Sequence, residues 1–266
     1  MSYFADKHVV VTGGSSGIGL ATAQGVVARG GRVTLVARRP KELEEARAAL
    51  GERAMALPLD VADEAEVGAR LGAHAEAHPV DMLVNNAGVV MPGRFLELES
   101  KQFRWMMDIN YFGTVNCCRA LIPGMVARKS GHVLNVSSMA GAIGIYGYTA
   151  YSATKFALVG FSQCLRAEMW PHGVRVSVCL PPDTDTPQLA FENQYKPAET
   201  KAIAGNVKTM TAAAVAKAML DGMEGNQFEI IPGLDGYFTS LAQRLVPGIV
   251  RAVCDRDQKK AATLKA

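Results

Sequence analysis

Short runs of apolar and β-branched residues recur along the chain, separated by longer stretches with helical spacing. The runs begin at His8, Arg32, Met55, Asp81, His132 and Arg175. Such runs are typical of strands buried on both faces of a parallel sheet. The stretches at 17–29 and 41–50 mix alanine, leucine and charged residues at helical spacing, which predicts helices that cover the sheet. The alternation predicts an α/β fold, a doubly wound parallel sheet with helices on both faces.

No repeat, low-complexity tract or linker interrupts this pattern, so we expect a single domain over residues 1–266. Two segments depart from the alternation. We expect residues 183–210 to form an irregular insertion that serves as a substrate loop, and residues 237–266 an appended amphipathic segment. In a doubly wound sheet, a ligand lies beyond the carboxyl ends of the strands, where the strand order reverses.

The composition excludes several classes of protein. With 49% hydrophobic and 20% charged residues, the chain can bury a large core and is not a disordered protein. A net charge of +3 gives no protein-wide basic field, which argues against nucleic acid as a partner.

The cysteines and the hydropathy pattern bear on location. The five cysteines form no CxxC pair and have no histidine at ligand spacing, which indicates a reducing compartment and no metal site. The chain shows neither an export signal nor about 18 consecutive apolar residues. We therefore expect a cytoplasmic protein with, at most, peripheral membrane contact.

The first apolar run leads into the glycine-rich sequence TGGSSGIG at residues 12–19, directly before a predicted helix. Glycine permits a tight turn and a close approach of the backbone to a pyrophosphate, while the helix N-terminus offers free N–H groups. The alternative is a turn that uses glycine for structural reasons alone. We expect a dinucleotide to contact Gly13, Ser15, Ser16, Gly17, Ile18 and Gly19.

Tyr151 and Lys155 are four residues apart and so fall on one face of a predicted helix. Ser138 lies 13 residues before Tyr151 at the end of an apolar run, and Asn110 lies 28 residues before Ser138. Taken alone, the YxxxK pair could be an ordinary exposed helix pair, and a buried asparagine could simply satisfy a backbone group. Beside a glycine-rich loop, the four residues are a candidate catalytic group.

The TGxxxGxG pattern, the NNAG motif at residues 85–88 and this four-residue spacing together resemble the short-chain dehydrogenase/reductase family. The resemblance spans about residues 6–180 and implies a Rossmann-like fold, a catalytic tetrad of Asn110, Ser138, Tyr151 and Lys155, and a homo-oligomer that uses the helix at 151–169. It also implies cofactor contacts from Asp60, Val61, Asn86, Ala87, Gly88, Tyr151, Lys155, Pro181, Thr184 and Thr186.

The tetrad implies a ketone reduction. A phenol with a pKa of about 10 is a poor catalyst near pH 7, so we expect the ammonium of Lys155 to lower the pKa of Tyr151. By resemblance, Lys155 also holds the nicotinamide ribose. Tyr151 then protonates the carbonyl oxygen as hydride arrives, Ser138 hydrogen-bonds that oxygen, and Asn110 positions a water that resupplies the proton.

The end of the second apolar run predicts which nicotinamide cofactor is used. An NAD site places an acidic side chain there for the ribose 2′-hydroxyl, whereas this chain has Arg38 and Arg39. A guanidinium pairs with a 2′-phosphate, so we expect NADPH/NADP, with Arg38 as the stronger contact. The alternative is a pair of solvent-facing charges ahead of a helix.

Three further segments narrow the resemblance. PPDTDTP from residue 181, FENQYKPAET from residue 191 and LDGYFTS from residue 234 look like the 3-ketodihydrosphingosine reductases of sphingolipid synthesis. The resemblance implies a lipid-like ketone substrate. The alternatives are a reductase of another apolar ketone, such as a steroid or 3-oxoacyl thioester, and a non-catalytic NADP(H)-binding protein.

The C-terminal segment carries an apolar stripe. Its members are Phe238, Leu241, Leu245, Ile249 and Val253, with Arg244 and Arg251 beside them. This pattern suits a helix that contacts an anionic bilayer surface or a long acyl chain, and equally a helix that packs on the core or on a second subunit. Pro247-Gly248 should break the helix.

Overall fold

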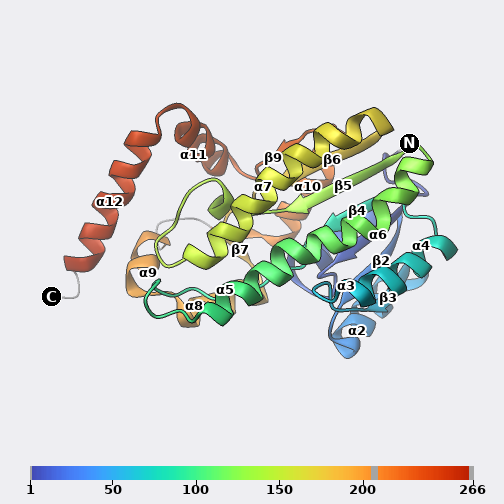
Figure 1. Cartoon of the computed structure of the whole chain (residues 1–266), viewed down its shortest axis with the longest axis horizontal. Helices are drawn as coiled ribbons and strands as arrows, with labels where there is room; N and C mark the ends of the chain where they lie inside the picture. Colours follow the sequence, from blue (N-terminus) through green and yellow to red (C-terminus); the bar gives the residue numbers. More distant parts are fainter. Residues whose placement is uncertain (1, 205–208, 264–266) are drawn as a thin grey trace.

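The computed structural model describes residues 2–204 and 209–263, and its centre is a parallel sheet of seven strands in the order β3-β2-β1-β4-β5-β6-β9 (Figure 1). The strands are β1 (His8–Thr12), β2 (Arg32–Ala37), β3 (Ala54–Pro58), β4 (Met82–Asn85), β5 (Gly131–Val136), β6 (Val174–Cys179) and β9 (Glu229–Ile230). All six strands expected from the apolar runs are confirmed. The seventh, β9, was not predicted because it is only two residues long.

The strand order reverses between β1 and β4. The chain proceeds from β1 outward to β3, then returns to place β4 on the other side of β1 and continues through β5 and β6. A crevice therefore opens beyond the carboxyl ends of β1 and β4, which is where open α/β sheets bind ligands.

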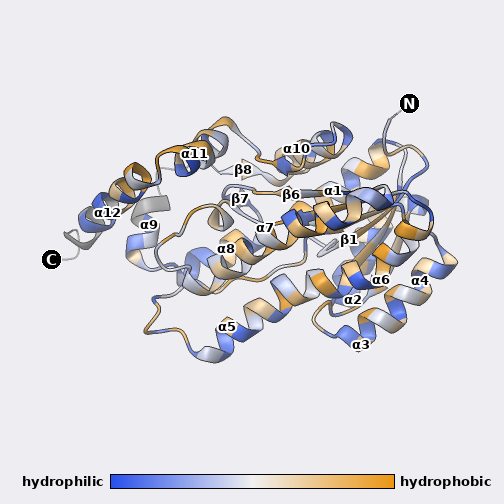
Figure 2. Cartoon of the chain, turned by 45° about the horizontal axis from the view of Figure 1, so that its top comes forward, coloured by the Kyte–Doolittle hydropathy of each residue, from blue (hydrophilic) through white to orange (hydrophobic). Residues whose placement is uncertain are grey.

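Helices cover both faces of the sheet, and the β-branched strand residues alternate between two cores. One core, which includes Val9 and Val11, packs against α1 (Gly17–Ala28), α2 (Pro40–Leu50) and α10 (Ala212–Glu224). The other, which includes Val10, packs against α4 (Gly72–Ala77), α6 (Gly113–Ala127) and α7 (Thr149–Met169). Figure 2 shows the sheet strands as hydrophobic and the covering helices as mixed, which is the pattern that burial of one helix face produces.

Shorter helical elements lie in the connections between the strands. They are η1 (Gly51–Arg53), α3 (Glu64–Glu66), η2 (Val67–Leu71), α5 (Ser100–Met107), η3 (Asp108–Phe112), η4 (Met139–Gly141) and η5 (Trp170–His172). Of these, η2 and η3 are π-helical turns within longer helical stretches. Such turns frequently occur at functional sites.

The insertion at 183–210 is more regular than expected. It holds β7 (Thr184–Asp185), α8 (Pro187–Tyr195), α9 (Ala198–Ala204) and β8 (Met210–Thr211), and β7 pairs with β8. The Thr186 hydroxyl accepts a hydrogen bond from the backbone N–H of Leu189, and Pro187 occupies the first turn of α8. This capping starts a helix where the sequence alone predicted an irregular loop. Residues 205–208 of the expected insertion lie outside the described residues.

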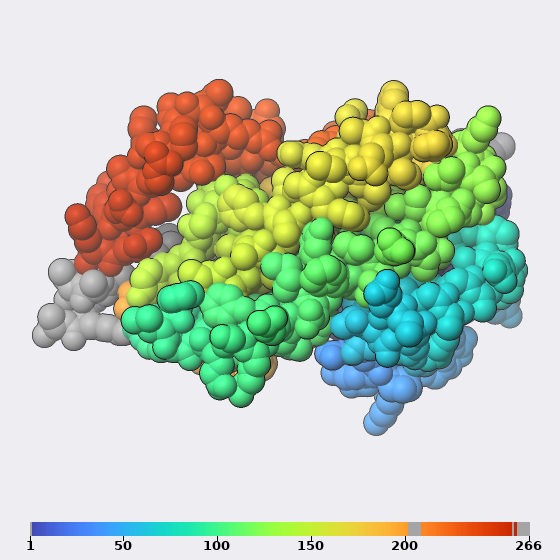
Figure 3. Space-filling view, in the orientation of Figure 1, coloured from blue at the N-terminus to red at the C-terminus, as the bar shows by residue number. Residues whose placement is uncertain are grey.

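The C-terminal segment forms two helices, α11 (Leu234–Leu245) and α12 (Pro247–Thr263), which lie as an arm along one end of the molecule (Figure 3). The predicted break at Pro247 is confirmed, since Val246 separates the helices. The expected stripe of Phe238, Leu241, Leu245, Ile249 and Val253 is exposed along both helices. Within 2–204 and 209–263, no helix is long and apolar enough to span a bilayer. Residues 264–266 of this segment lie outside the described residues.

Two histidines of the sheet, His8 on β1 and His132 on β5, are buried as neutral side chains. The Ser177 hydroxyl donates to the carbonyl of Gln227 at 2.6 Å, so it accepts from Nε2–H of His132 at 2.9 Å. His8 Nε2 lies 2.8 Å from the Thr34 hydroxyl. Burial lowers the pKa of His132 to about 3 and that of His8 to about 4.

These histidines should make the protein less stable in mild acid. Both folded-state pKa values lie below the unfolded value of about 6.5, so the unfolded chain takes up protons first as the pH falls. The stability that the neutral histidines contribute is fully present above about pH 6.5 and is lost as the pH falls through about 4 for His8 and about 3 for His132. We expect the melting temperature to fall between pH 7.5 and 5, and to fall less steeply in His132→Gln. Equal pH slopes for the two proteins would contradict this assignment.

Candidate active site

A cavity of about 770 Å³ lies at the carboxyl ends of the strands. Every residue proposed from the sequence for catalysis or cofactor binding lines it, except Gly19 and Asn110. Those that line it are Gly13, Ser15, Ser16, Gly17, Ile18, Arg38, Arg39, Asp60, Val61, Asn86, Ala87, Gly88, Ser138, Tyr151, Lys155, Pro181, Thr184 and Thr186.

The glycine-rich turn is held against the end of β4 by side-chain to backbone hydrogen bonds. The Thr12 hydroxyl accepts from the backbone N–H groups of Asn86 and Ala87, both at 3.0 Å. The Asn86 amide donates back to the Thr12 carbonyl at 3.0 Å. Gly13 and Gly17 have φ angles of +64° and +55°, a conformation that disfavours any side chain.

The turn leaves the N-terminus of α1 available to an anion. Ser16 makes no side-chain capping hydrogen bond, and the first turn of α1 carries no acidic residue. Free N–H groups and the helix dipole favour a phosphate there. The residues present therefore fit a dinucleotide.

Gly19 does not face the cavity, although the sequence predicted a contact. A Cβ atom at Gly19 would lie 2.3 Å from the carbonyl oxygen of Gly13 and 2.5 Å from the Asn86 amide nitrogen. Gly19 is thus a packing residue that allows α1 to approach the glycine-rich turn. It affects the site indirectly, by setting the position of that turn.

The two arginines expected to select the cofactor lie at the edge of the cavity. Arg38 has its guanidinium 3.7 Å from the carboxylate of Asp60, and Arg39 pairs with Glu42 at 3.0 Å. All four side chains are partly exposed. Both guanidinium groups can reorient toward an anion in the cavity, since exposed ion pairs are weak.

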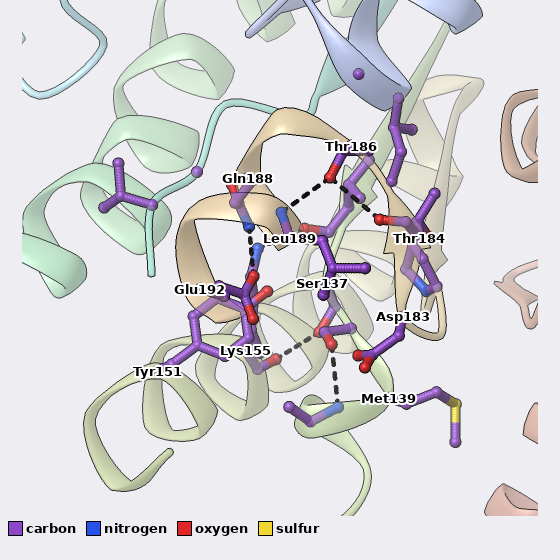
Figure 4. Close-up of a pocket in the computed structure, with 18 of the residues that line it drawn as sticks. Ser137, Met139, Tyr151, Lys155, Asp183, Thr184, Thr186, Gln188, Leu189 and Glu192 are labelled. Carbon is purple, nitrogen blue, oxygen red and sulfur yellow. Dashed lines mark hydrogen bonds between the residues drawn. The ribbon is translucent and has the colours of Figure 1, made fainter. Parts of the chain in front are cut away.

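Tyr151 and Lys155 come together at the end of β5. Both are buried on α7, with the Lys155 Nζ 5.5 Å from the centre of the Tyr151 ring. Nζ donates to the Val136 carbonyl at 3.0 Å. The Ser137 hydroxyl donates to the Lys155 carbonyl at 2.8 Å (Figure 4). The Ser137 hydroxyl is thereby used for structure. Ser138 is left as the hydroxyl beside Tyr151, as the 13-residue spacing predicted.

The pKa of Tyr151 differs from the expectation. Burial raises the pKa of Tyr151 above its ordinary value, although a hydrogen bond from Ser138 opposes the shift. Burial also lowers the pKa of Lys155 to about 8. The expected lowering of the Tyr151 pKa is therefore wrong, because desolvation of the buried phenolate and the negative charge of Glu192 both raise it.

Asn110 lies in the π-helical turn η3 and is fully buried. Its side-chain oxygen accepts from the backbone N–H of Val89 at 2.7 Å, and its amide donates to the Val89 carbonyl at 2.9 Å and the Thr154 hydroxyl at 3.0 Å. These bonds use the side chain to position the loop after β4 against α7. The geometry favours a positioning role over the water-holding role that the sequence predicted.

The loop that follows β6, residues 180–186, forms part of the cavity wall. Pro181 accepts a backbone hydrogen bond from Met139 at 2.9 Å, which ties this loop to the segment after Ser138. The Thr186 hydroxyl donates to the Thr184 carbonyl at 3.2 Å. Pro182 also lines the cavity.

The far side of the cavity is built from residues that the sequence analysis did not single out. It includes Met139, Ile143, Ile145, Tyr146, Tyr148, Glu192, Lys196, Thr200, Gly236 and Thr239. Tyr146 and Tyr148 lie in the segment between Ser138 and Tyr151, and Glu192 and Lys196 lie in FENQYKPAET. The sequence analysis used FENQYKPAET to narrow the family resemblance, but the resemblance gave no role to any single residue of that segment.

Replacing Gly19 by alanine should damage the site without touching the cavity. The added Cβ forces the turn to shift, at a cost of about 1–3 kcal/mol for overpacking. We expect a lower melting temperature and at least about tenfold weaker dinucleotide binding by fluorescence titration. Gly68→Ala is the matched control because a Cβ there meets open space. Equal dinucleotide affinity in Gly19→Ala and wild type would contradict the packing role.

Known proteins share this arrangement. Residues 7–197 match the family model described as short chain dehydrogenase. A 3-dehydrosphinganine reductase of Danio rerio is 44% identical over 88% of this chain and 73% of its own length. A 3-ketodihydrosphingosine reductase of Bos taurus is 42% identical over the same shares.

Solved structures agree with the fold. A short-chain dehydrogenase from Streptomyces avermitilis superposes with a TM-score of 0.80 at 32% identity, covering 99% of this chain and 100% of that one. A short-chain dehydrogenase from Sphingobium yanoikuyae in complex with NADPH gives a TM-score of 0.78 at 26% identity, covering 90% and 93%. The chain belongs to the short-chain dehydrogenase/reductase family and is a nicotinamide-dependent oxidoreductase.

Proposed function

We propose that the protein reduces the 3-keto group of 3-ketodihydrosphingosine to the alcohol of dihydrosphingosine with NADPH. The observation that carries the proposal is the buried Tyr151, beside Ser138 and Lys155, in a cavity that continues past the apolar side chains of Met139 and Ile145. A reactive phenol that opens onto an apolar extension suits a ketone on a long hydrocarbon chain.

The residues of this chain supply proton transfer and orientation. When bound, the nicotinamide supplies the hydride that adds to the carbonyl carbon. Burial keeps the phenol of Tyr151 protonated, so it can donate that proton to the carbonyl oxygen. Ser138 donates a hydrogen bond to the same oxygen, and the Lys155 ammonium stabilises the charge left on the tyrosine.

The substrate assignment is supported by the relatives and by the C-terminal arm. Proteins named 3-dehydrosphinganine or 3-ketodihydrosphingosine reductase are identical to this chain at more than two fifths of the aligned positions, which span 88% of this chain. Gly236 and Thr239 of α11 line the cavity, while the outer side of the arm carries exposed apolar side chains. Contact of that outer side with a bilayer stays a prediction, as does a homo-oligomer.

Turnover of the sphingoid ketone tests the proposal. We expect NADPH absorbance to fall when 3-ketodihydrosphingosine is added, with kcat/KM at least about tenfold above that for a steroid ketone or a 3-oxoacyl thioester. Higher turnover of either control would favour the alternative reductase. Binding of NADPH without turnover of any ketone in a broad panel would favour a non-catalytic protein.

We also propose that the protein prefers NADPH over NADH because of Arg38 and Arg39. Two guanidinium groups at the cavity edge, with no acidic side chain at the end of β2, suit a 2′-phosphate. The solved relative from Sphingobium yanoikuyae binds NADPH, which supports this preference.

Removing Arg38 should weaken the preference. We expect Arg38→Ala to raise the KM for NADPH by about tenfold while the KM for NADH changes little, because the charge-assisted hydrogen bonds to the phosphate are lost. Arg47→Ala is a matched control, since Arg47 lies on α2 and pairs with Glu44 away from the cavity. Comparable efficiency of NADH and NADPH with the wild-type protein would refute the preference.

A further inference from the structure

A buried carboxylate, Glu192, faces the reacting groups from α8. Only 8% of Glu192 is exposed, and it lines the same cavity as Tyr151. Its Oε2 accepts from the Tyr148 hydroxyl at 2.9 Å, and its Oε1 from the Gln188 amide at 3.4 Å. Figure 4 draws Glu192 above Tyr151 and Lys155, with Asp183 bordering the same cavity.

The local structure fixes this position. The Thr186 cap and Pro187 start α8, and Glu192 lies on the side of the helix that faces the cavity. The ring of Tyr148 is 5.8 Å from that of Tyr151, so the group that orients Glu192 is also packed against the catalytic phenol. Burial is the main influence on the pKa of both Tyr151 and Lys155, raising that of Tyr151 and lowering that of Lys155, and the negative charge of Glu192 acts on both in the raising direction. The carboxylate therefore lies within electrostatic range of the reacting centre.

Among the described residues, Glu192 has no basic side chain at ion-pair distance. Lys196, one turn along α8, has its Nζ 3.6 Å from the carboxylate of Asp183. Burial raises the pKa of Glu192, and the charge of Lys196 offsets this only in part. A desolvated carboxylate without a full counter-charge is costly, and a cationic ligand would remove that cost.

Resting on the proposed function, we propose that Glu192 binds an ammonium group next to the reacting carbonyl, so that the enzyme selects long-chain α-amino ketones. The amine of 3-ketodihydrosphingosine is on the carbon adjacent to the ketone. With the ketone oxygen on Tyr151 and Ser138, that amine lies on the Tyr148 side of the site, where it donates to Glu192. Asp183 borders the same part of the cavity and pairs with Lys196, so the two carboxylates and one ammonium leave one negative charge for a cationic ligand.

An ammonium site at Glu192 distinguishes α-amino ketones from ketones that carry no amine. Steroid ketones and 3-oxoacyl thioesters carry no cation beside the carbonyl, so binding them would further desolvate Glu192 without a partner. An α-amino ketone gains a charge-assisted hydrogen bond instead. Glu192 is therefore a specificity-determining residue.

The test compares two substrates in the complete protein. They are 3-ketodihydrosphingosine and its analogue with hydrogen in place of the amine, assayed by NADPH consumption. We expect wild type to favour the amine, and Glu192→Gln to lower the ratio of the two kcat/KM values by about 10- to 100-fold, as expected for loss of a charged hydrogen bond. Glu64→Gln, at a largely exposed carboxylate, is the control and should leave the ratio unchanged.

A second variant shows whether an effect of Glu192→Gln comes from the lost charge or from a folding defect. Tyr148→Phe removes the donor that orients Glu192 and should lower the same ratio by a smaller factor, with thermal unfolding measured for each protein. An equal loss on both substrates in Glu192→Gln, or a wild type that does not discriminate between them, would overturn the role of Glu192. Those outcomes leave the proposed function intact provided that 3-ketodihydrosphingosine is reduced. Absence of its reduction by wild type overturns the proposed function itself.

Discussion

The chemistry depends on two hydrogen bonds that fasten the start of α7 to the end of β5. The Lys155 Nζ donates to the Val136 carbonyl, and the Ser137 hydroxyl donates to the Lys155 carbonyl. These bonds are buried, so losing either would leave an unsatisfied polar group. They hold Lys155 and Tyr151 beside Ser138 at the edge where parallel strands present their carboxyl ends. A phenol that would otherwise be an ordinary helix residue thereby faces a substrate cavity.

The same edge of the sheet organises cofactor binding. Thr12 at the end of β1 and Asn86 after β4 each hydrogen-bond to the backbone of the other. The glycine-rich turn after β1 is therefore fixed to the end of β4, across the point where the strand order reverses. Asn110 ties the loop after β4 to α7 through Val89 and Thr154. The cofactor side and the catalytic side are thus one connected network, and residues outside the cavity can act on both.

The features predictable from sequence were those with a local signal. Six strands were evident because burial on both faces requires continuous apolar runs. The tetrad was predicted from the resemblance to the short-chain dehydrogenase/reductase family, whose spacing these residues match. The π-helical turn at Asn110 and the contact of Gly19 with the glycine-rich turn are properties of packing, so motif matching assigned Asn110 to holding a catalytic water and Gly19 to a cofactor contact. The pKa of Tyr151 depends on burial, which spacing does not report. Glu192 was missed because the role that we propose for it requires α8 to meet Tyr148, which lies 44 residues earlier in the sequence.

The central claim is that the phenolic hydroxyl of Tyr151 transfers a proton to the substrate. It is tested most directly by comparing Tyr151→Phe with Tyr111→Phe, whose hydroxyl lies outside the cavity. For each variant, NADPH affinity and single-turnover reduction of 3-ketodihydrosphingosine are measured. The account predicts that Tyr151→Phe binds NADPH as wild type does but reduces the ketone at least about 100-fold more slowly, the usual range for a lost general acid. Wild-type rates in Tyr151→Phe would contradict it.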